Sequence, residues 1–137
     1  MIRTGSCQCG AVRISTSVEP ITTRACWCHD CQKLAAGGPT HNALFKTEEV
    51  TVEGEVRWHD VLADSGNRLA RGFCPQCGTP LLVQSHARRH LMGVRIGAFD
   101  DVTDLAPASL IWTEAAPRWA MLDPNLPKTD RQPPPVG

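Results

Sequence analysis

Cys74-Pro75-Gln76-Cys77-Gly78 has the spacing of a zinc knuckle. In such a turn the two thiolates converge on one ion, and the glycine lets the backbone direct its amides toward the sulfurs. Two further cysteine clusters precede it, Cys7-Gln8-Cys9-Gly10 and Cys26-Trp27-Cys28-His29-Asp30-Cys31. The sequence has seven cysteines, all in these three clusters. Because seven is odd, internal disulfides cannot pair them all. We therefore expect thiolate ligands to a metal.

The seven thiols divide into four and three, and two partitions fit that division. The first joins the two Cys-x-x-Cys pairs in one ribbon-like site. The second joins the first and third clusters in a closed four-thiolate site and leaves the middle cluster as a triplet. We favour the second, because the triplet lies within six residues and converges on one ion without help. The predicted ligands are then Cys7, Cys9, Cys74 and Cys77 for a structural zinc, and Cys26, Cys28 and Cys31 for an open site.

Length and charge exclude several classes of protein. The 137 residues suit a single domain, and 14 basic residues balance 14 acidic ones. That balance argues against a nucleic-acid partner, which would favour a basic excess. No run of 18 apolar residues is present, so we expect no membrane span, and no secretory leader precedes the first cysteines. We expect a cytoplasmic protein whose thiols stay reduced or metal-bound.

The spacing of apolar residues predicts a mainly β domain with one or two short helical turns. Alternation with period two predicts a strand over 12–18, a hairpin over 50–59 that turns at Gly54, and later strands near 81–83, 94–98 and 109–113. A short helical turn is expected over 30–36. We expect the domain to span residues 1–127, followed by a Pro-rich, flexible tail over 128–137.

The ordered set of cysteine motifs resembles the glutathione-dependent formaldehyde-activating enzymes, also called S-hydroxymethylglutathione synthases, a family that includes the domain of centromere protein V. The resemblance covers about residues 4–127. It is carried by the three cysteine motifs with their flanks and by short apolar stretches further on: residues 5–12, 26–33, 72–81, 97–101, 111–112 and 117–119. Any one motif alone would be weak, whereas the ordered combination is specific.

The resemblance implies a single domain of coiled antiparallel sheets with short helical turns, built around a structural zinc. It implies that the four-thiolate set holds this zinc and that the triplet Cys26, Cys28 and Cys31 holds a second, catalytic zinc. The implied activity is that of a carbon–sulfur lyase, in which a small thiol adds to formaldehyde. His29, Asp30, Gln32 and Leu110 depart from the residues that members often carry at these places, so the resemblance does not fix the thiol, which is glutathione or another small thiol.

The chemistry of the triplet agrees with this activity. A zinc with three protein ligands keeps a fourth position for a thiol, a water or a carbonyl oxygen. The alternative is a non-catalytic zinc module for a protein or small-molecule partner, which would have no need of an open site. Near the triplet, we expect His29 to face solvent and Lys33 to be either a surface charge or an attractor of anionic thiols. Trp112 and Trp119 are expected to pack in the core.

Overall fold

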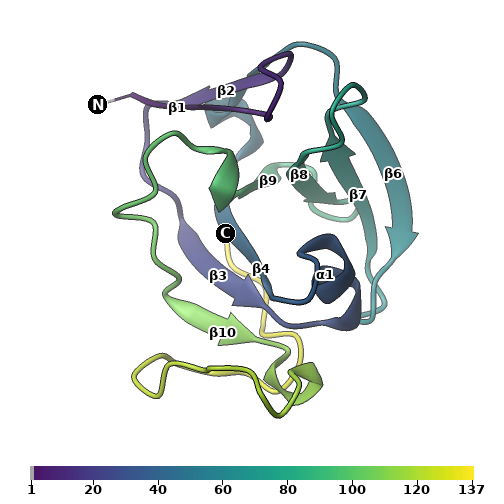
Figure 1. Ribbon diagram of the computed structural model, residues 1–137, viewed down its shortest axis with the longest axis vertical. Helices are drawn as coiled ribbons and strands as arrows, with labels where there is room; N and C mark the ends of the chain where they lie inside the picture. Colours follow the sequence, from purple (N-terminus) through teal and green to yellow (C-terminus); the bar gives the residue numbers. More distant parts are fainter. Residues whose placement is uncertain (1) are drawn as a thin grey trace.

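Two β-sheets form the framework of the protein in the computed structural model, which describes residues 2–137 (Figure 1). The smaller sheet has the order β1-β2-β5 and consists of β1 (Arg3–Ser6), β2 (Arg13–Thr16) and β5 (Thr51–Glu53). The larger sheet has the order β10-β3-β4-β9-β8-β7-β6. Its strands are β3 (Thr22–Cys26), β4 (Thr40–Lys46), β6 (Arg57–Leu62), β7 (Arg68–Phe73), β8 (Pro80–Ser85), β9 (Leu91–Arg95) and β10 (Ser109–Ile111).

Helical structure is limited to short pieces, as the sequence predicts. The α-helix α1 (His29–Leu34) follows β3, close to the expected turn. The 3-10 turns are η1 (Thr47–Glu49), η2 (Ile96–Ala98) and η3 (Thr113–Ala115). The predicted mainly β, single-domain class with little helix is thus confirmed.

One strand pair departs from the antiparallel pattern. β10 runs parallel to β3, and the other paired strands of both sheets are antiparallel. Antiparallel neighbours can be joined by tight turns, whereas parallel neighbours need a long connection. Six strands lie between β3 and β10 in the chain, so no short turn fixes their relative direction.

The seven-stranded sheet separates two environments. Side chains alternate between the faces of a strand. On one face Ala43 and Phe45 of β4 and Val94 of β9 are fully buried in the core. On the opposite face, Asn42 and Leu44 of the same β4 line a pocket. The core therefore lies on one side of this sheet and the pocket on the other.

The hairpin predicted over 50–59 is wrong. β5 pairs with β2 in the small sheet, and β6 pairs with β7 in the large one, so the two segments belong to different sheets. Alternation identifies a half-buried strand but not its partner. The predicted turn at Gly54 is confirmed. This residue has φ +99°, and a Cβ there would lie 2.2 Å from the carbonyl oxygen of Ala11. The chain crosses between the sheets at this turn.

The C-terminal segment lies against the large sheet. The Thr129 amide donates to the carbonyl of Leu110 at 3.0 Å, and the Leu110 amide donates to the carbonyl of Pro127 at 3.0 Å. Further on, Arg88 Nη2 donates to the carbonyl oxygen of Val136 at 2.9 Å. In Figure 1 this yellow end of the chain runs from beside β10 toward the middle of the molecule. These contacts describe a docked, extended segment, and its flexibility in solution stays a prediction.

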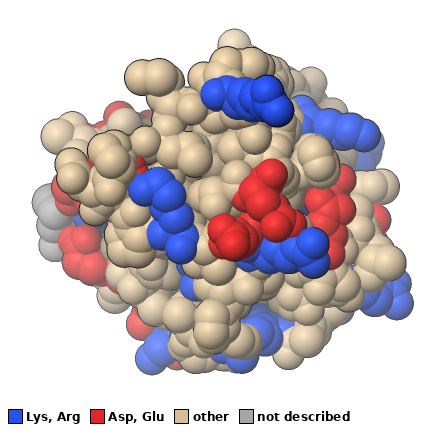
Figure 2. All heavy atoms as spheres, turned by 90° about the horizontal axis from the view of Figure 1, so that it is seen from below, with Lys and Arg blue, Asp and Glu red and all other residues tan. Residues whose placement is uncertain are grey.

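The surface shows no segregation of charge on the face seen in Figure 2, where acidic and basic side chains are interspersed among uncharged ones. Among residues 2–137, no helix has the length and apolar character needed to cross a bilayer.

Candidate metal sites and the adjoining pocket

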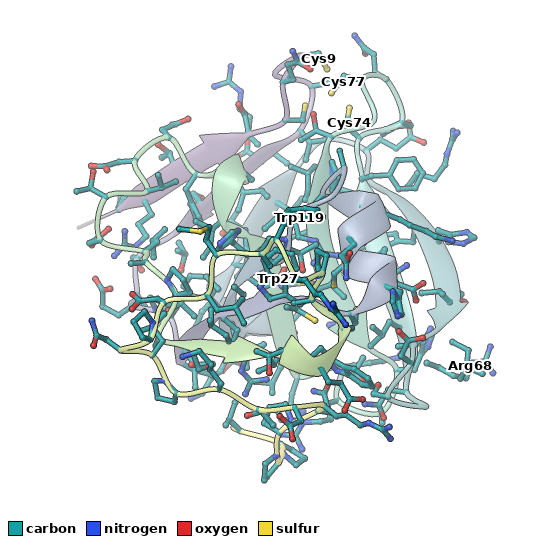
Figure 3. All side chains as sticks on the ribbon, turned by 60° about the horizontal axis from the view of Figure 1, so that its bottom comes forward. Cys9, Trp27, Arg68, Cys74, Cys77 and Trp119 are labelled. Atoms are coloured by element: carbon teal, nitrogen blue, oxygen red, sulfur yellow. The ribbon has the colours of Figure 1, made fainter. Side chains whose placement is uncertain are left out.

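Four cysteines from two distant loops meet at one end of the molecule. Cys7 and Cys9 lie in the loop between β1 and β2, and Cys74 and Cys77 lie in the turn between β7 and β8. Figure 3 shows Cys9, Cys74 and Cys77 close together on these loops. All four Sγ atoms lie within 4.8 Å of one another. This four-cysteine site joins the small sheet to the large one.

The sulfur separations fit a tetrahedral thiolate site. Cys7 Sγ lies 3.6 Å from Cys9 Sγ, and Cys9 Sγ lies 3.8 Å from Cys74 Sγ. A disulfide would bring two sulfurs to about 2 Å, and all seven cysteines are free. Four ligands at a zinc–sulfur distance of about 2.3 Å are separated by about 3.8 Å along each edge of a tetrahedron. The donor set and its spacing therefore suit a zinc ion.

Backbone amides and one hydroxyl surround these sulfurs. Cys7 Sγ accepts from the Val12 amide at 3.3 Å, and Cys74 Sγ accepts from the Cys77 amide at 3.5 Å. Thr79 Oγ1 lies 3.1 Å from Cys77 Sγ, and hydrogen bonding to Thr79 lowers the pKa of Cys77 to about 5. Hydrogen bonds that favour a thiolate also prepare it to bind a cation.

The other three cysteines form a second cluster, the three-cysteine site. Cys26 ends β3, Cys28 caps the N-terminus of α1 and Cys31 lies within α1, and their Sγ atoms lie within 4.8 Å of one another. Cys28 Sγ accepts from the Cys31 amide at 3.3 Å. Thr40 Oγ1 donates to Cys31 Sγ at 3.0 Å. A strand end followed at once by a helix brings three ligands from six consecutive residues to one point.

Hydrogen bonding among the three thiols favours deprotonation of one of them, Cys31. Hydrogen bonds from Cys26 and Cys28 lower the pKa of Cys31 to about 2, with a further contribution from Thr40. The pKa of Cys26 is correspondingly raised by its hydrogen bonds to the other two thiols and by burial. The cluster thus provides a negative centre for a cation.

This arrangement is the four-plus-three partition favoured from the sequence. Both clusters can hold a metal ion, and their all-sulfur donors are consistent with zinc. The three-cysteine site differs in having fewer protein ligands than the four that close a structural zinc site.

A cavity of about 380 Å³ opens beside the three-cysteine site. All three of its cysteines line the cavity, and the four-cysteine site does not. The walls come from the pocket face of the large sheet, from the β6–β7 turn and from the C-terminal segment. Much of the lining is apolar, including Leu44, Val83 and Ile111. The three-cysteine site is therefore the one that opens into a cavity.

Sequence reasoning missed the polar side chains beside these cysteines. Arg24, Asn42, Arg71 and Arg95 line the same cavity. Arg24 lies two residues before Cys26 on β3, so strand alternation placed it on the same face as a predicted ligand. The other three come from distant strands, and no spacing in the sequence connects them to the cysteines.

The structure also tests the expectations for the histidine, lysine and tryptophans singled out in the sequence. His29 is exposed, as expected, and Lys33 is also exposed. Trp112 is partly buried and packs against the three-cysteine cluster. The prediction for Trp119 is wrong, because 71% of this residue is exposed. It lies in an irregular stretch after η3 (Figure 3), where no strand or helix orients it toward the core.

The fold and the two thiol clusters define a small β protein with two candidate metal sites, one closed and one beside a pocket. The family model described as "Glutathione-dependent formaldehyde-activating enzyme" matches residues 2–115. The chain belongs to this family, as its motifs predict.

Two comparisons extend this result. The chain is 27% identical, over 129 residues, to a curated protein of Halomonas elongata named "Putative glutathione-dependent formaldehyde-activating enzyme"; the match covers 90% of this chain and 82% of that one. A crystal structure of a Rhodobacter sphaeroides protein matches with a TM-score of 0.57 and 22% identity, over 74% of this chain and 91% of that one. The structural match supports the fold alone.

Proposed function

We propose that this protein is a zinc-dependent carbon–sulfur lyase that joins a small thiol to a small aldehyde such as formaldehyde, and releases them in reverse. The observation that carries the proposal is the three-cysteine site opening into a cavity. Membership of a formaldehyde-activating family supports the substrates, with glutathione or another small thiol as the nucleophile. Free cysteines agree with a reducing compartment, so we place the protein in the cytoplasm.

Cys26, Cys28 and Cys31 would hold the catalytic zinc, and Cys7, Cys9, Cys74 and Cys77 the structural one. A zinc with an open position supplies Lewis acidity, which lowers the pKa of a thiol or polarises a carbonyl. In the overall reaction the thiol sulfur forms a bond to the aldehyde carbon, the carbonyl π bond breaks, and the thiol proton ends on the new hydroxyl. No other reactant is needed.

The chain contributes positioning as well as ligands. The floor of the cavity is a sheet, and much of the lining beside the three cysteines is apolar. Holding both reactants beside one another removes much of the entropic cost of a bimolecular addition. Thr40 fixes Cys31 by its hydrogen bond, so the cluster keeps its shape when a reactant enters.

The experiment compares zinc-loaded wild type with Cys28→Ser. Exchange between formaldehyde and its thiol adduct is followed by NMR, with glutathione and with smaller thiols. We expect wild type to bind two zinc ions and accelerate exchange, and Cys28→Ser to stay folded, lose one zinc and lose the acceleration. Lack of acceleration with every thiol and aldehyde, at full zinc occupancy, would favour a non-catalytic zinc module.

A further inference from the structure

Polar side chains form a row across the sheet beside the three-cysteine site. Arg24, Asn42 and Arg95 occupy directly opposed positions on β3, β4 and β9. The next row on the same face contains Cys26 and Thr40, which are also directly opposed. Rows two residues apart along a strand are separated by about 7 Å. A small molecule is therefore long enough to reach from the three cysteines to the row of Arg24, Asn42 and Arg95.

Two guanidinium groups in this pocket have unused hydrogen-bond donors. Arg95 is only 9% exposed, and the side chain of Arg71 on β7 is 14% exposed. Arg95 Nη1 donates to Asn42 at 2.6 Å, and Arg71 Nη2 donates to Asp30 at 3.4 Å. Within residues 2–137 the buried Nε atoms of both arginines have no partner. A guanidinium carries five N–H donors, and buried donors without acceptors are costly.

Arginines outnumber the carboxylates of acidic side chains around the cavity. Its lining includes four arginines and one carboxylate, that of Asp64, and Asp30 adds a second carboxylate as the partner of Arg71. A zinc ion with three thiolates contributes one negative charge. Arg88 is already engaged by the oxygens of Val136 at 2.9 Å and Gly137 at 2.6 Å, whereas the other arginines are at least partly buried, where a charge is poorly solvated. The pocket is suited to an anionic ligand.

We propose that Arg71 and Arg95 form a carboxylate subsite beside the three-cysteine site, so that one of the two reactants carries a carboxylate a few atoms from its reacting sulfur or carbonyl carbon. Arginine suits this role, because its planar fork of donors matches a carboxylate. The proposal rests on the proposed function for the nature of the reactants. If the arginines only balance the thiolates, the enzyme will be indifferent to a carboxylate on either reactant.

The first arm of the test places the carboxylate on the thiol. With formaldehyde and zinc-loaded wild type, kcat/KM is compared for 3-mercaptopropionate and for its neutral isostere 3-mercaptopropionamide. The second arm places it on the aldehyde, comparing glyoxylate with formaldehyde while 2-mercaptoethanol is the thiol. The uncatalysed rate of each pair is subtracted. We expect a preference of about tenfold for the charged member in one arm, which corresponds to about 1.4 kcal/mol.

The variants test whether the two arginines cause this preference. Arg71→Gln should abolish it, and Arg71→Lys should retain part of it because the charge is kept. Arg95→Lys should weaken it, because an ammonium lacks the planar fork. The matched control is Arg68→Gln, on the same strand but exposed at the outer edge of the molecule (Figure 3), and it should behave as wild type. Circular dichroism establishes that each variant is folded.

A binding measurement separates this proposal from the proposed function. Calorimetric Kd values of zinc-loaded protein are compared for 3-mercaptopropionate and its amide, without an aldehyde. Tighter binding of the acid that disappears in Arg71→Gln supports a carboxylate subsite on the thiol side, even if no turnover is found. Equal kcat/KM for charged and neutral partners in both arms, or a preference that persists in Arg71→Gln, overturns the subsite and leaves the lyase activity standing.

Discussion

At the scale of single residues, Gly5 shows how closely the small sheet approaches the rest of the core. This residue of β1 is buried and forms an isolated bridge with Phe99, just after η2. A Cβ at Gly5 would lie 2.1 Å from the carbonyl oxygen of Ala98. The obstacle is backbone, which cannot rotate away as a side chain can.

Replacing Gly5 by alanine should therefore destabilise the protein by about 1–3 kcal/mol, because the added methyl group overpacks the contact. Chemical denaturation of the zinc-loaded protein measures the loss. The control is Gly97→Ala, since a Cβ at Gly97 meets no atom within 4 Å. That variant should match or slightly exceed wild type. Equal stabilities of the two variants would contradict the close approach at Gly5.

The sequence predicted the cysteine ligands but not the arginines beside them. Cysteines are rare and reactive, so their clustering alone indicated both ligand groups. Arg71 and Arg95 belong to a common residue type, and they meet the cysteines only because β7 and β9 are strands of the same sheet as β3 and β4 and face the same cavity. Contacts between residues of distant strands leave no pattern of spacing in the sequence.

At the scale of elements, β1 is tied to the turn that precedes β10 through one buried side chain. Arg3 Nη1 donates to Asp104 at 2.7 Å, and Arg3 Nη2 donates to Glu19 at 2.8 Å. The Arg3 guanidinium holds the pKa of Asp104 below its ordinary value of 3.8. This ion pair links three segments that are distant in the sequence.

Asp104→Asn should lower stability at neutral pH, and the difference from wild type should disappear in acid. A carboxyl group with a depressed folded-state pKa stabilises the fold fully above its unfolded pKa, and this contribution is lost as the pH falls through the folded value. We expect a constant difference from pH 8 to about pH 5 and a decline below about pH 4.

Urea midpoints of the two proteins, measured at each pH, test this expectation. The comparison is restricted to pH values at which both proteins keep their zinc, because protonation of the thiolates releases the metal. Glu53→Gln, on exposed β5, serves as the control and should show little effect. A difference that grows toward low pH would contradict the assigned ion pair.

Strands were predicted correctly where the alternation of apolar and polar residues was enough to identify them. The strand predicted over 12–18 contains β2. The predicted hairpin failed because β5 and β6 both alternate but pair with different sheets. The Pro-rich residues 128–137 carry no period, and their contacts with β10 and Arg88 use backbone amide and carbonyl groups, which composition does not reveal.

For the whole molecule, the four-cysteine site lies between the two sheets, where a bound zinc would hold them together. It joins the β1–β2 loop to the β7–β8 turn, which are more than sixty residues apart in the sequence. Structural zinc contributes about 10–16 kcal/mol in zinc-finger peptides, compared with about 5–15 kcal/mol for the net stability of a domain. With the structural zinc that we propose at this site, the fold should depend on the ion.

Cys74→Ser should give unfolded or insoluble protein, whereas Cys28→Ser should remain folded. Zinc content and near-ultraviolet circular dichroism, read on both variants, distinguish the two outcomes. Removal of zinc from wild type with a strong chelator should unfold the protein in the same way, and added zinc should restore it. A folded, soluble Cys74→Ser would falsify the structural role of the four-cysteine site.

The alternation along the large sheet has a consequence for how this protein can evolve. Neighbouring residues of one strand belong to different tasks: Ala43 and Phe45 lie in the core, and Asn42 and Leu44 lie in the pocket. A mutation on the pocket face can change ligand preference while leaving the packing of the core intact. Related proteins could therefore diverge in substrate on a single scaffold, and a library randomised only at pocket-facing positions would explore that divergence in the laboratory.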